Sequence, residues 1–274
     1  MSKILTQDSF IDVKKKKKQP FQIFAKSWTP DQLKTDIPII MFHDSLGSVQ
    51  LWRDFPEKLA QITGAKVFAY DRLGFGQSSA HPERLAYDFV PYETTHGFKA
   101  ILDHFQIQDF IAIGHSVGGG IATCCAQQYP ERCKALITIS AHAIVEALTL
   151  VGIREAKAMF QLEGQLDRLK KYHGEKAQWV LDSWTETWLS EEFQDWNLEP
   201  ILKQVHCPLL VIHGDQDEYG SVEQPKRFIE NVAGSSQLHI IQGGHHFPHR
   251  EQPDLVLSFM NDFLSGLDSL KISA

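Results

Sequence analysis

The sequence of 274 residues has few cysteines, no long apolar run and no excess of basic residues, and each absence excludes a class of protein. No apolar segment approaches the roughly 20 residues that a membrane-spanning helix needs. The first 20 residues also lack the apolar core of a signal peptide. We therefore expect neither a membrane anchor nor secretion, and no membrane partner.

The four cysteines form neither a disulfide framework nor a zinc-binding pattern. Cys124 and Cys125 are adjacent, whereas Cys133 and Cys207 stand alone. Structural zinc sites instead group their ligands in short, regular spacings. We therefore expect a reduced, cytoplasmic protein that uses no metal and no cofactor.

The charge balance argues against nucleic acid as a partner. Lysine and arginine total 27 and aspartate and glutamate total 34, which gives a formal net charge of -7. Phosphate binding needs a basic face, which this composition does not favour. The one basic cluster is the lysine run Lys14 to Lys18. We interpret it as a solvated loop or hairpin turn rather than as a site for nucleic acid or an anionic surface.

Short apolar segments alternate with helical patterns from about residue 21 onward. The apolar segments are rich in β-branched and aromatic residues and lack polar alternation, which is typical of strands covered on both faces of a parallel sheet. The alternation predicts an α/β protein with a doubly wound, mostly parallel sheet. The expected strands are residues 21–28, 38–42, 66–70, 110–113, 135–139, 208–212 and 237–241, and the expected helices are 51–62, 92–105, 121–128 and one behind Pro253.

Residues 143–205 interrupt this alternation. They contain helical patterns, no convincing strand and four tryptophans, and the span is too long for an ordinary loop. We therefore expect a helical cap at 143–205, inserted between core residues 1–142 and 206–274 and covering the carboxyl edge of the sheet.

The strongest chemical signal follows the expected strand 110–113. Residues 114–118 read Gly-His-Ser-Val-Gly and lead into a helix of small residues. A strand that turns sharply into a helix leaves little room for side chains, so glycines on either side of the serine fit such a turn. The start of the helix presents backbone N–H groups and a partial positive charge to an oxyanion. The pattern predicts that Ser116 is a nucleophile rather than an incidental serine in a glycine-rich turn.

A serine hydroxyl needs a base, and an acid and then a histidine should follow it along the chain. Residues 243–249 read Gly-Gly-His-His-Phe-Pro-His after the last expected strand, and residues 214–217 read Gly-Asp-Gln-Asp after strand 208–212. Position along the chain alone leaves His245 and His246 open as the base, and two aspartates open as the acid.

A polar turn, His-Asp-Ser-Leu-Gly-Ser at 43–48, follows the expected strand 38–42. Such a turn can direct a backbone amide toward the serine. We therefore expect the amides of Ser45 and Val117 to form an oxyanion hole.

These segments resemble the α/β-hydrolase superfamily from about residue 21 to residue 263. The resemblance rests on the turn 43–48, the segment Asp-Arg-Leu-Gly-Phe-Gly-Gln-Ser at 71–78, the Gly114-to-Gly118 turn, the loop 214–217 and the stretch 246–253. The family pattern G-x-x-D implies that Asp217 is the acid. Its pattern G-H-x-P-x-x-E-x-P implies that His246 is the base.

The sequence departs from the family pattern at two positions. The resemblance also implies structural roles for residues near the site. His245 and Asp44 stand where the family usually has glycine. The resemblance implies that Asp71 and Arg72 brace the sheet edge. It implies likewise that His43 and His115 shape the site without acting as bases.

A serine at this turn differs from the aspartate of haloalkane dehalogenases and epoxide hydrolases of the same fold, and it suits addition to a carbonyl. We therefore expect hydrolysis of a carboxylic ester or lactone through an acyl-enzyme. Two other classes stay open, because fold alone does not choose the reaction. One is a cofactor-free carbon–carbon hydrolase, lyase or oxygenase, and the other is a ligand receptor without turnover.

The expected cap predicts the character of the substrate. Met159, Phe160, Trp184 and Trp188 supply apolar area that we expect to line a pocket, while other aromatic residues pack the cap itself. Such a pocket suits a medium acyl chain, an aryl ester or a lactone ring, with acyl-homoserine lactones as one specific candidate. The expected partner is thus a small apolar ester or lactone. The oligomeric state is left open, with a homodimer as one option.

Overall fold

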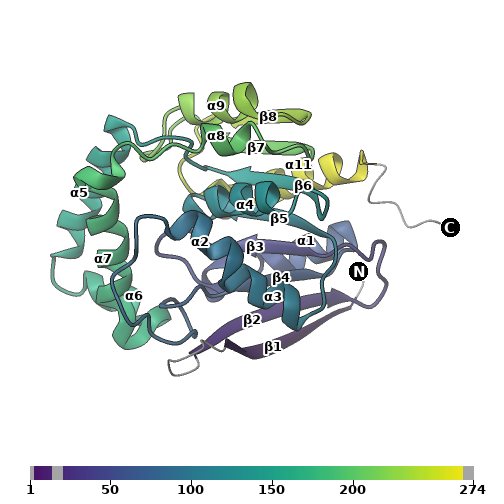
Figure 1. Cartoon of the computed structure of the whole chain (residues 1–274), viewed down its shortest axis with the longest axis horizontal. Coiled ribbons are helices and arrows are strands. Elements are labelled where there is room, and N and C mark those ends of the chain that lie inside the picture. The colour runs from purple at the N-terminus through teal and green to yellow at the C-terminus, as the bar shows by residue number, and fades with distance from the viewer. Residues whose placement is uncertain (1–2, 14–20, 268–274) are drawn as a thin grey trace.

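The computed structural model describes residues 3–13 and 21–267 and shows an eight-stranded sheet with helices on both faces (Figure 1). The strand order is β1-β2-β4-β3-β5-β6-β7-β8. Strands β3 to β8 pair in parallel, and β1 and β2 add an antiparallel edge. This confirms the predicted α/β class with a doubly wound, mostly parallel sheet.

The described strands and helices have the following bounds. The strands are β1 Ile4–Val13, β2 Phe21–Pro30, β3 Ile39–Phe42, β4 Val67–Tyr70, β5 Phe110–His115, β6 Cys133–Ile139, β7 Leu209–Gly214 and β8 Ser236–Ile241. The α-helices are α1 Phe55–Thr63, α2 Phe89–Thr95, α3 Gly97–His104, α4 Val117–Gln128, α5 Ala147–Phe160, α6 Gln165–His173, α7 Ala177–Trp188, α8 Glu199–Leu202, α9 Glu223–Asn231, α10 Pro248–Glu251 and α11 Pro253–Ser265. Short 3₁₀ turns lie at Val49–Trp52, Gly174–Lys176 and Glu191–Phe193.

In the described residues, two large apolar clusters cover the two faces of the sheet, and a third, smaller cluster lies between α6 and α7. Alternate residues of a strand point to opposite faces, so Phe42 of β3 belongs to the cluster under α3 and α4, whereas its neighbour Met41 belongs to the cluster under α1 and α11. Strands β3, β4, β5 and β7 are buried along their whole length. Burial on both faces explains why their sequences read as continuous apolar runs.

The largest differences from the sequence-based boundaries concern three of the expected helices. The helix expected at 92–105 is two helices, α2 and α3, separated at His96, whose φ of −119° and ψ of −86° are not helical. The helix expected at 51–62 begins only at Phe55, because Pro56 fits the first turn of a helix. Helix α4 starts at Val117 rather than at 121, since tertiary packing overrides the low helix propensity of its three glycines.

Strand β1 was not expected from the sequence. This strand pairs only with β2 at the sheet edge, and most of its residues are exposed. A strand with one solvated face carries no continuous apolar run, so β1 lacked the signal that marked the buried strands. The turn expected at Lys14 to Lys18 lies outside the described residues.

The segment in which a cap is expected contains α5, α6, α7 and α8 and no named strand. Figure 1 shows α5, α6 and α7 at one end of the sheet, whereas α8 lies beside α9, and α8 also contacts α4 of the core. The division at residues 143 and 205 stays a prediction. In the described residues, no helix is both long enough and apolar enough to cross a bilayer.

Candidate active site

The turn between β5 and α4 holds Ser116 in a strained backbone conformation. Its φ of 54° and ψ of −127° are rare for a residue with a side chain. The backbone N–H of Ser116 donates to the carbonyl of Ile139 (2.9 Å), and that of Gly119 donates to the carbonyl of Ser116 (2.8 Å). A Cβ atom at Gly114 would overlap the carbonyl of Gly118, and one at Gly118 would overlap the carbonyl of Phe42. This crowding explains the two glycines of the motif.

His246 and Asp217 meet across the loops that follow β8 and β7. The Nδ1–H of His246 lies 2.9 Å and 2.8 Å from the two carboxylate oxygens of Asp217. Burial acts to raise the pKa of Asp217, but the charge and hydrogen bond of His246 outweigh it and hold that pKa well below its usual range. The carboxylate therefore stays ionised and fixes the orientation of the imidazole, with Nδ1 protonated.

The other candidates for the base and the acid, His245 and Asp215, make different contacts. The imidazole of His245 is half-exposed, and its Nδ1 lies 3.1 Å from the carbonyl of Gln216. Asp215 accepts a hydrogen bond from the backbone N–H of Gly243 (2.7 Å). Both residues thus brace the two loops against each other. Of the pairs that position along the chain left open, the structure joins His246 to Asp217.

The loop that carries Asp217 is fastened to the beginning of α5. The Glu146 carboxylate accepts hydrogen bonds from the backbone N–H (2.9 Å) and the hydroxyl (2.7 Å) of Ser221. The Thr149 hydroxyl donates to the carbonyl of Tyr219 (2.6 Å). The acid loop and the first turn of α5 are therefore one hydrogen-bonded unit.

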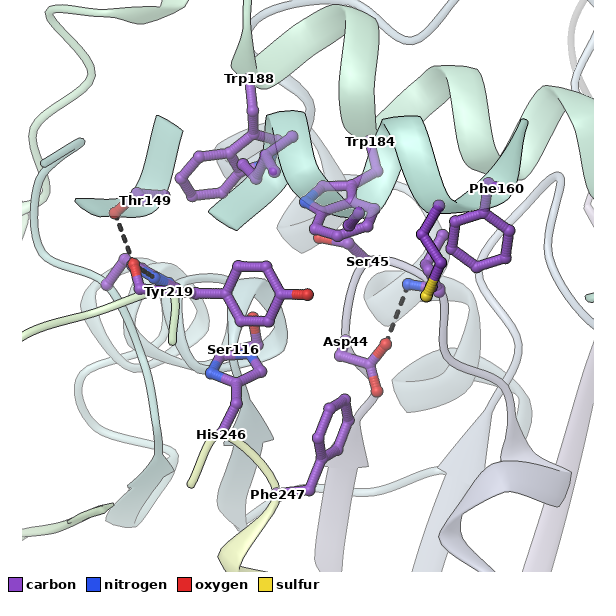
Figure 2. A pocket seen from close by; sticks show the side chains of 15 residues that line it. Asp44, Ser45, Ser116, Thr149, Phe160, Trp184, Trp188, Tyr219, His246 and Phe247 are labelled. Atoms are coloured by element: carbon purple, nitrogen blue, oxygen red, sulfur yellow. Dashed lines mark hydrogen bonds between the residues drawn. The ribbon is translucent and has the colours of Figure 1, made fainter. Parts of the chain in front are cut away.

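Ser116 and His246 line the same cavity, which has a volume of about 210 Å³ and is shown in Figure 2. No hydrogen bond joins the Ser116 hydroxyl to His246 within residues 3–13 and 21–267. Such bonds are often long or poorly aligned before substrate binds. Asp217, which is buried behind His246, is not part of the lining.

The turn after β3 supplies one wall of the cavity. The carboxylate of Asp44 accepts the backbone N–H of Leu46 (2.9 Å), and Arg72 donates to the carbonyl of Asp44 (2.9 Å). These bonds hold the turn without using the amide of Ser45. In the described part of the chain, the backbone N–H groups of Ser45 and Val117 have no hydrogen-bond acceptor. Both amides are therefore free to bind an oxygen atom of a ligand.

Asp44 also brings a carboxylate close to these free amides. Burial acts to raise its pKa, but a hydrogen bond from His115 and the charge of Arg250 hold the pKa well below its usual range. The Asp44 oxygen lies 3.3 Å from His115 Nδ1 and 3.7 Å from an Arg250 nitrogen. The other ring nitrogen of His115, Nε2, lies 2.8 Å from the carbonyl oxygen of His246. The residue that replaces the usual glycine thus caps its own turn and links it to the loop of His246.

The helices α5 and α7 form the apolar roof of the cavity. Met159 and Phe160 of α5 and Trp184 and Trp188 of α7, the four side chains expected from the sequence, all lie in the lining. Trp179 lies elsewhere and packs against Phe75 and His81. The other lining residues are Asp44, Ser45, Leu46, Ser116, His142, Thr149, Ile153, Ala156, Tyr219, His246 and Phe247.

Several of these lining residues were not expected from the sequence. For three of them, however, the position along the chain indicates that they lie near the site. Tyr219 lies two residues after Asp217, and Phe247 directly follows His246. His142 follows the carboxyl end of β6. Residues just beyond the carboxyl ends of parallel strands share one edge of the sheet, which is where ligands bind in such folds.

The possible metal ligands are dispersed. In the ranges that the structure describes, no group of three or more His, Cys, Asp or Glu side chains could hold a metal ion. All four cysteines are free thiols. The sulfur atoms of Cys133 and Cys207 lie 3.8 Å apart near the amino ends of β6 and β7, at the opposite end of these strands from Ser116.

Comparison with known proteins bears on the family and the fold. The sequence profile of the alpha/beta hydrolase fold matches residues 37–180. Protein ABHD8 of Mus musculus is 23% identical over 252 residues, which cover 84% of this chain. The chain spans only 56% of the length of that relative.

Two further proteins match over most of both chains. The 2-hydroxymuconate semialdehyde hydrolase of Pseudomonas sp. (strain CF600) is 25% identical over 258 residues, covering 86% of this chain and 89% of the relative. A thermophilic esterase from Thermogutta terrifontis superposes with a TM-score of 0.71 at 17% identity, covering 95% of this chain and 99% of the other. The structural match shows a shared fold.

Proposed function

The chain belongs to the alpha/beta hydrolase fold family, and on that premise we propose that it is a serine hydrolase acting on a small or medium-sized carboxylic ester or lactone. The observation that carries this proposal is the joint placement of three features at one cavity. These are a serine on a strained turn, an imidazole held by a buried carboxylate, and two backbone amides without acceptors. Together they meet the needs of acyl transfer.

In the proposed reaction, Nε2 of His246 takes the proton of the Ser116 hydroxyl as its oxygen attacks the substrate carbonyl carbon. The amides of Ser45 and Val117 bind the resulting oxyanion. When the carbon–oxygen bond to the leaving group breaks, His246 returns the proton to the leaving alcohol, which leaves an acyl group on Ser116. His246 then deprotonates water, which hydrolyses the acyl-enzyme and restores the serine.

The lining of the cavity supports an uncharged substrate. None of the described lining residues is lysine or arginine, and the side chains from α5 and α7 are largely apolar. An anionic substrate would find no counter-charge there and would meet the carboxylate of Asp44. This supports an ester or lactone with a hydrocarbon portion, including acyl-homoserine lactones as the specific lactone case.

A carbon–carbon hydrolase is the second candidate. It is favoured by the similarity to 2-hydroxymuconate semialdehyde hydrolase over most of both chains. A cluster of polar side chains in the cap would be expected for such chemistry. The roof of this cavity is instead mostly apolar, and its one polar group from α5, the Thr149 hydroxyl, donates to Tyr219. Parallel assays of esters, lactones and carbon–carbon substrates, with Ser116→Ala as the control, would rank the candidates.

The location of the protein, its partners and its use of cofactors are also proposals. We place the protein in the cytoplasm, with a small apolar ester or lactone as its partner and without metal, cofactor, membrane or nucleic acid. The net charge of -7 supports the absence of nucleic acid.

The rate should depend on the length of the acyl chain. If Met159, Phe160, Trp184 and Trp188 bind the chain, kcat/KM should rise from acetyl to medium-chain p-nitrophenyl esters by up to roughly tenfold per two well-buried methylenes. Long-chain triglyceride emulsions should be poor substrates, because the roof excludes a lipid interface. A flat profile or a preference for acetate would mean that these aromatic residues only pack the helices.

The two aspartates of the acid loop should differ sharply. Asp217→Asn should lower kcat by about 10⁴-fold, because a neutral amide stabilises neither the productive tautomer nor the imidazolium. Asp215→Asn is the matched control, because the Asp215 carboxylate accepts a hydrogen bond from the backbone of Gly243 instead of from His246, and its loss should cost less than about tenfold. Steady-state kinetics on one activated ester measures both. Equal losses would remove Asp217 from the role of acid.

A further inference from the structure

Tyr219 presents a phenol group to the cavity from the side of His246. In Figure 2 its ring extends into the cavity, with the hydroxyl at the far end. The ring lies edge-on to the imidazole of His246, with centroids 4.8 Å apart, and to the indole of Trp184, with centroids 5.7 Å apart. The phenol therefore lies within the space that a substrate attached to Ser116 would occupy.

The backbone of Tyr219 is held on both sides. Its N–H donates to Asp217 Oδ1 (2.8 Å), and its carbonyl accepts from the Thr149 hydroxyl (2.6 Å) and from His142 Nε2 (3.0 Å). These bonds connect Tyr219 to the acid and to α5 at once. Its side chain is thus placed before substrate binds, which lowers the entropic cost of using it for recognition.

The phenol hydroxyl is an unused donor. It has no hydrogen-bond partner among residues 3–13 and 21–267, and because Tyr219 is half-buried and lines the cavity, the hydroxyl is open to a ligand there. Burial and the charges of Glu218 and Asp217 raise the pKa of Tyr219 to about 12, so the hydroxyl keeps its proton. A substrate that covered it with hydrocarbon would leave a desolvated donor unpaired, whereas a substrate with a suitably placed oxygen would satisfy it.

We propose that Tyr219 is a specificity-determining residue whose hydroxyl donates a hydrogen bond to a second oxygen atom of the substrate, beyond the ester group that reacts with Ser116. The substrate class is then an oxygen-substituted ester, such as one with an ether or keto oxygen, rather than a plain alkyl ester. The oxygen belongs either to the acyl part or to the alcohol part, and the two sources offer the same acceptor. This inference rests on the proposed ester hydrolysis.

The test uses two pairs of esters. Within each pair, one ester has an oxygen atom at the position where the other has a methylene group. For the acyl side the pair is p-nitrophenyl methoxyacetate and p-nitrophenyl butyrate. For the alcohol side it is 2-methoxyethyl butyrate and butyl butyrate. The ratio of kcat/KM within each pair is compared between the parent and Tyr219→Phe, so that the intrinsic reactivity of the esters cancels.

In at least one pair, Tyr219→Phe should reduce the preference for the oxygen-containing ester by about three- to tenfold, the effect of one neutral hydrogen bond. The pair that responds identifies the half of the substrate that carries the oxygen. The matched control is Tyr87→Phe, which also removes one tyrosine hydroxyl, but from an exposed residue outside the cavity lining. It should leave both ratios unchanged.

Ratios that stay within twofold of the parent in both pairs would overturn the role of Tyr219 and leave the phenol as a packing group. Ser116→Ala, assayed on the same esters, separates this failure from a failure of the proposed function. If Ser116→Ala is inactive and the ratios do not change, only the inference about Tyr219 is lost. If Ser116→Ala keeps the parent rate, ester hydrolysis at this cavity is itself refuted.

Discussion

Ser116→Ala is expected to abolish turnover of esters while leaving the protein folded. The substitution removes the attacking oxygen, and alanine fits the space of serine. In serine hydrolases, loss of the nucleophile lowers kcat by about 10⁶-fold. The remaining acceleration over the reaction in water, about 10³–10⁴-fold, comes from the oxyanion hole and substrate binding. Steady-state kinetics on an activated ester measures the loss.

A fluorophosphonate probe provides an independent readout of the same change. The parent protein should be labelled at Ser116, and the alanine variant should not be labelled at all. Thermal melting should show that the variant unfolds in a single transition like the parent, which separates loss of the nucleophile from loss of the fold. Peptide mapping that finds the label on a different serine would refute the assignment.

His246→Ala should be as damaging as loss of the nucleophile, again about 10⁶-fold in kcat, because the serine then has no base. The matched control is His245→Ala, which truncates the adjacent imidazole. His245 is half-exposed and contacts Gln216 rather than the cavity, so its loss should cost at most about tenfold through looser packing of the loop.

Both histidine variants are compared by kcat on one ester and by the rate of fluorophosphonate labelling. Labelling should slow strongly in His246→Ala and little in His245→Ala, because the base activates the serine for the probe as well. The opposite ranking would shift the base by one residue and would contradict the pairing of His246 with Asp217.

The buried strands were predictable because burial on both faces leaves a direct trace in the sequence. Strands β2 to β7 correspond to six of the expected apolar segments, and the seventh segment is the edge strand β8, in which only Ile241 is buried. The sharp turn at Ser116 was predictable for a related reason, since Gly114 and Gly118 are required by backbone crowding. By contrast, β1 is an exposed edge strand, and the separation of α2 from α3 at His96 depends on packing that no local pattern records.

The choice between adjacent candidates could not be made from spacing. His245 and His246 both follow β8, and the direction of each side chain is set by contacts with another loop. The same holds for Tyr219, whose place in the cavity depends on bonds to Thr149 of a distant helix. Long-range hydrogen bonds fix these directions, and a single sequence shows them only through resemblance to a family.

The bonds between the acid loop and the first turn of α5 limit how substrate range can be re-engineered by exchanging segments. A graft that replaces residues 143–205 as a block would also remove Glu146 and Thr149, which hold the chain just beyond Asp217. Such a chimaera would change the reaction centre together with the roof. A junction placed after Thr149 would keep both partners of the acid loop and still replace Met159, Phe160, Trp184 and Trp188, the side chains that meet the hydrocarbon part of a ligand.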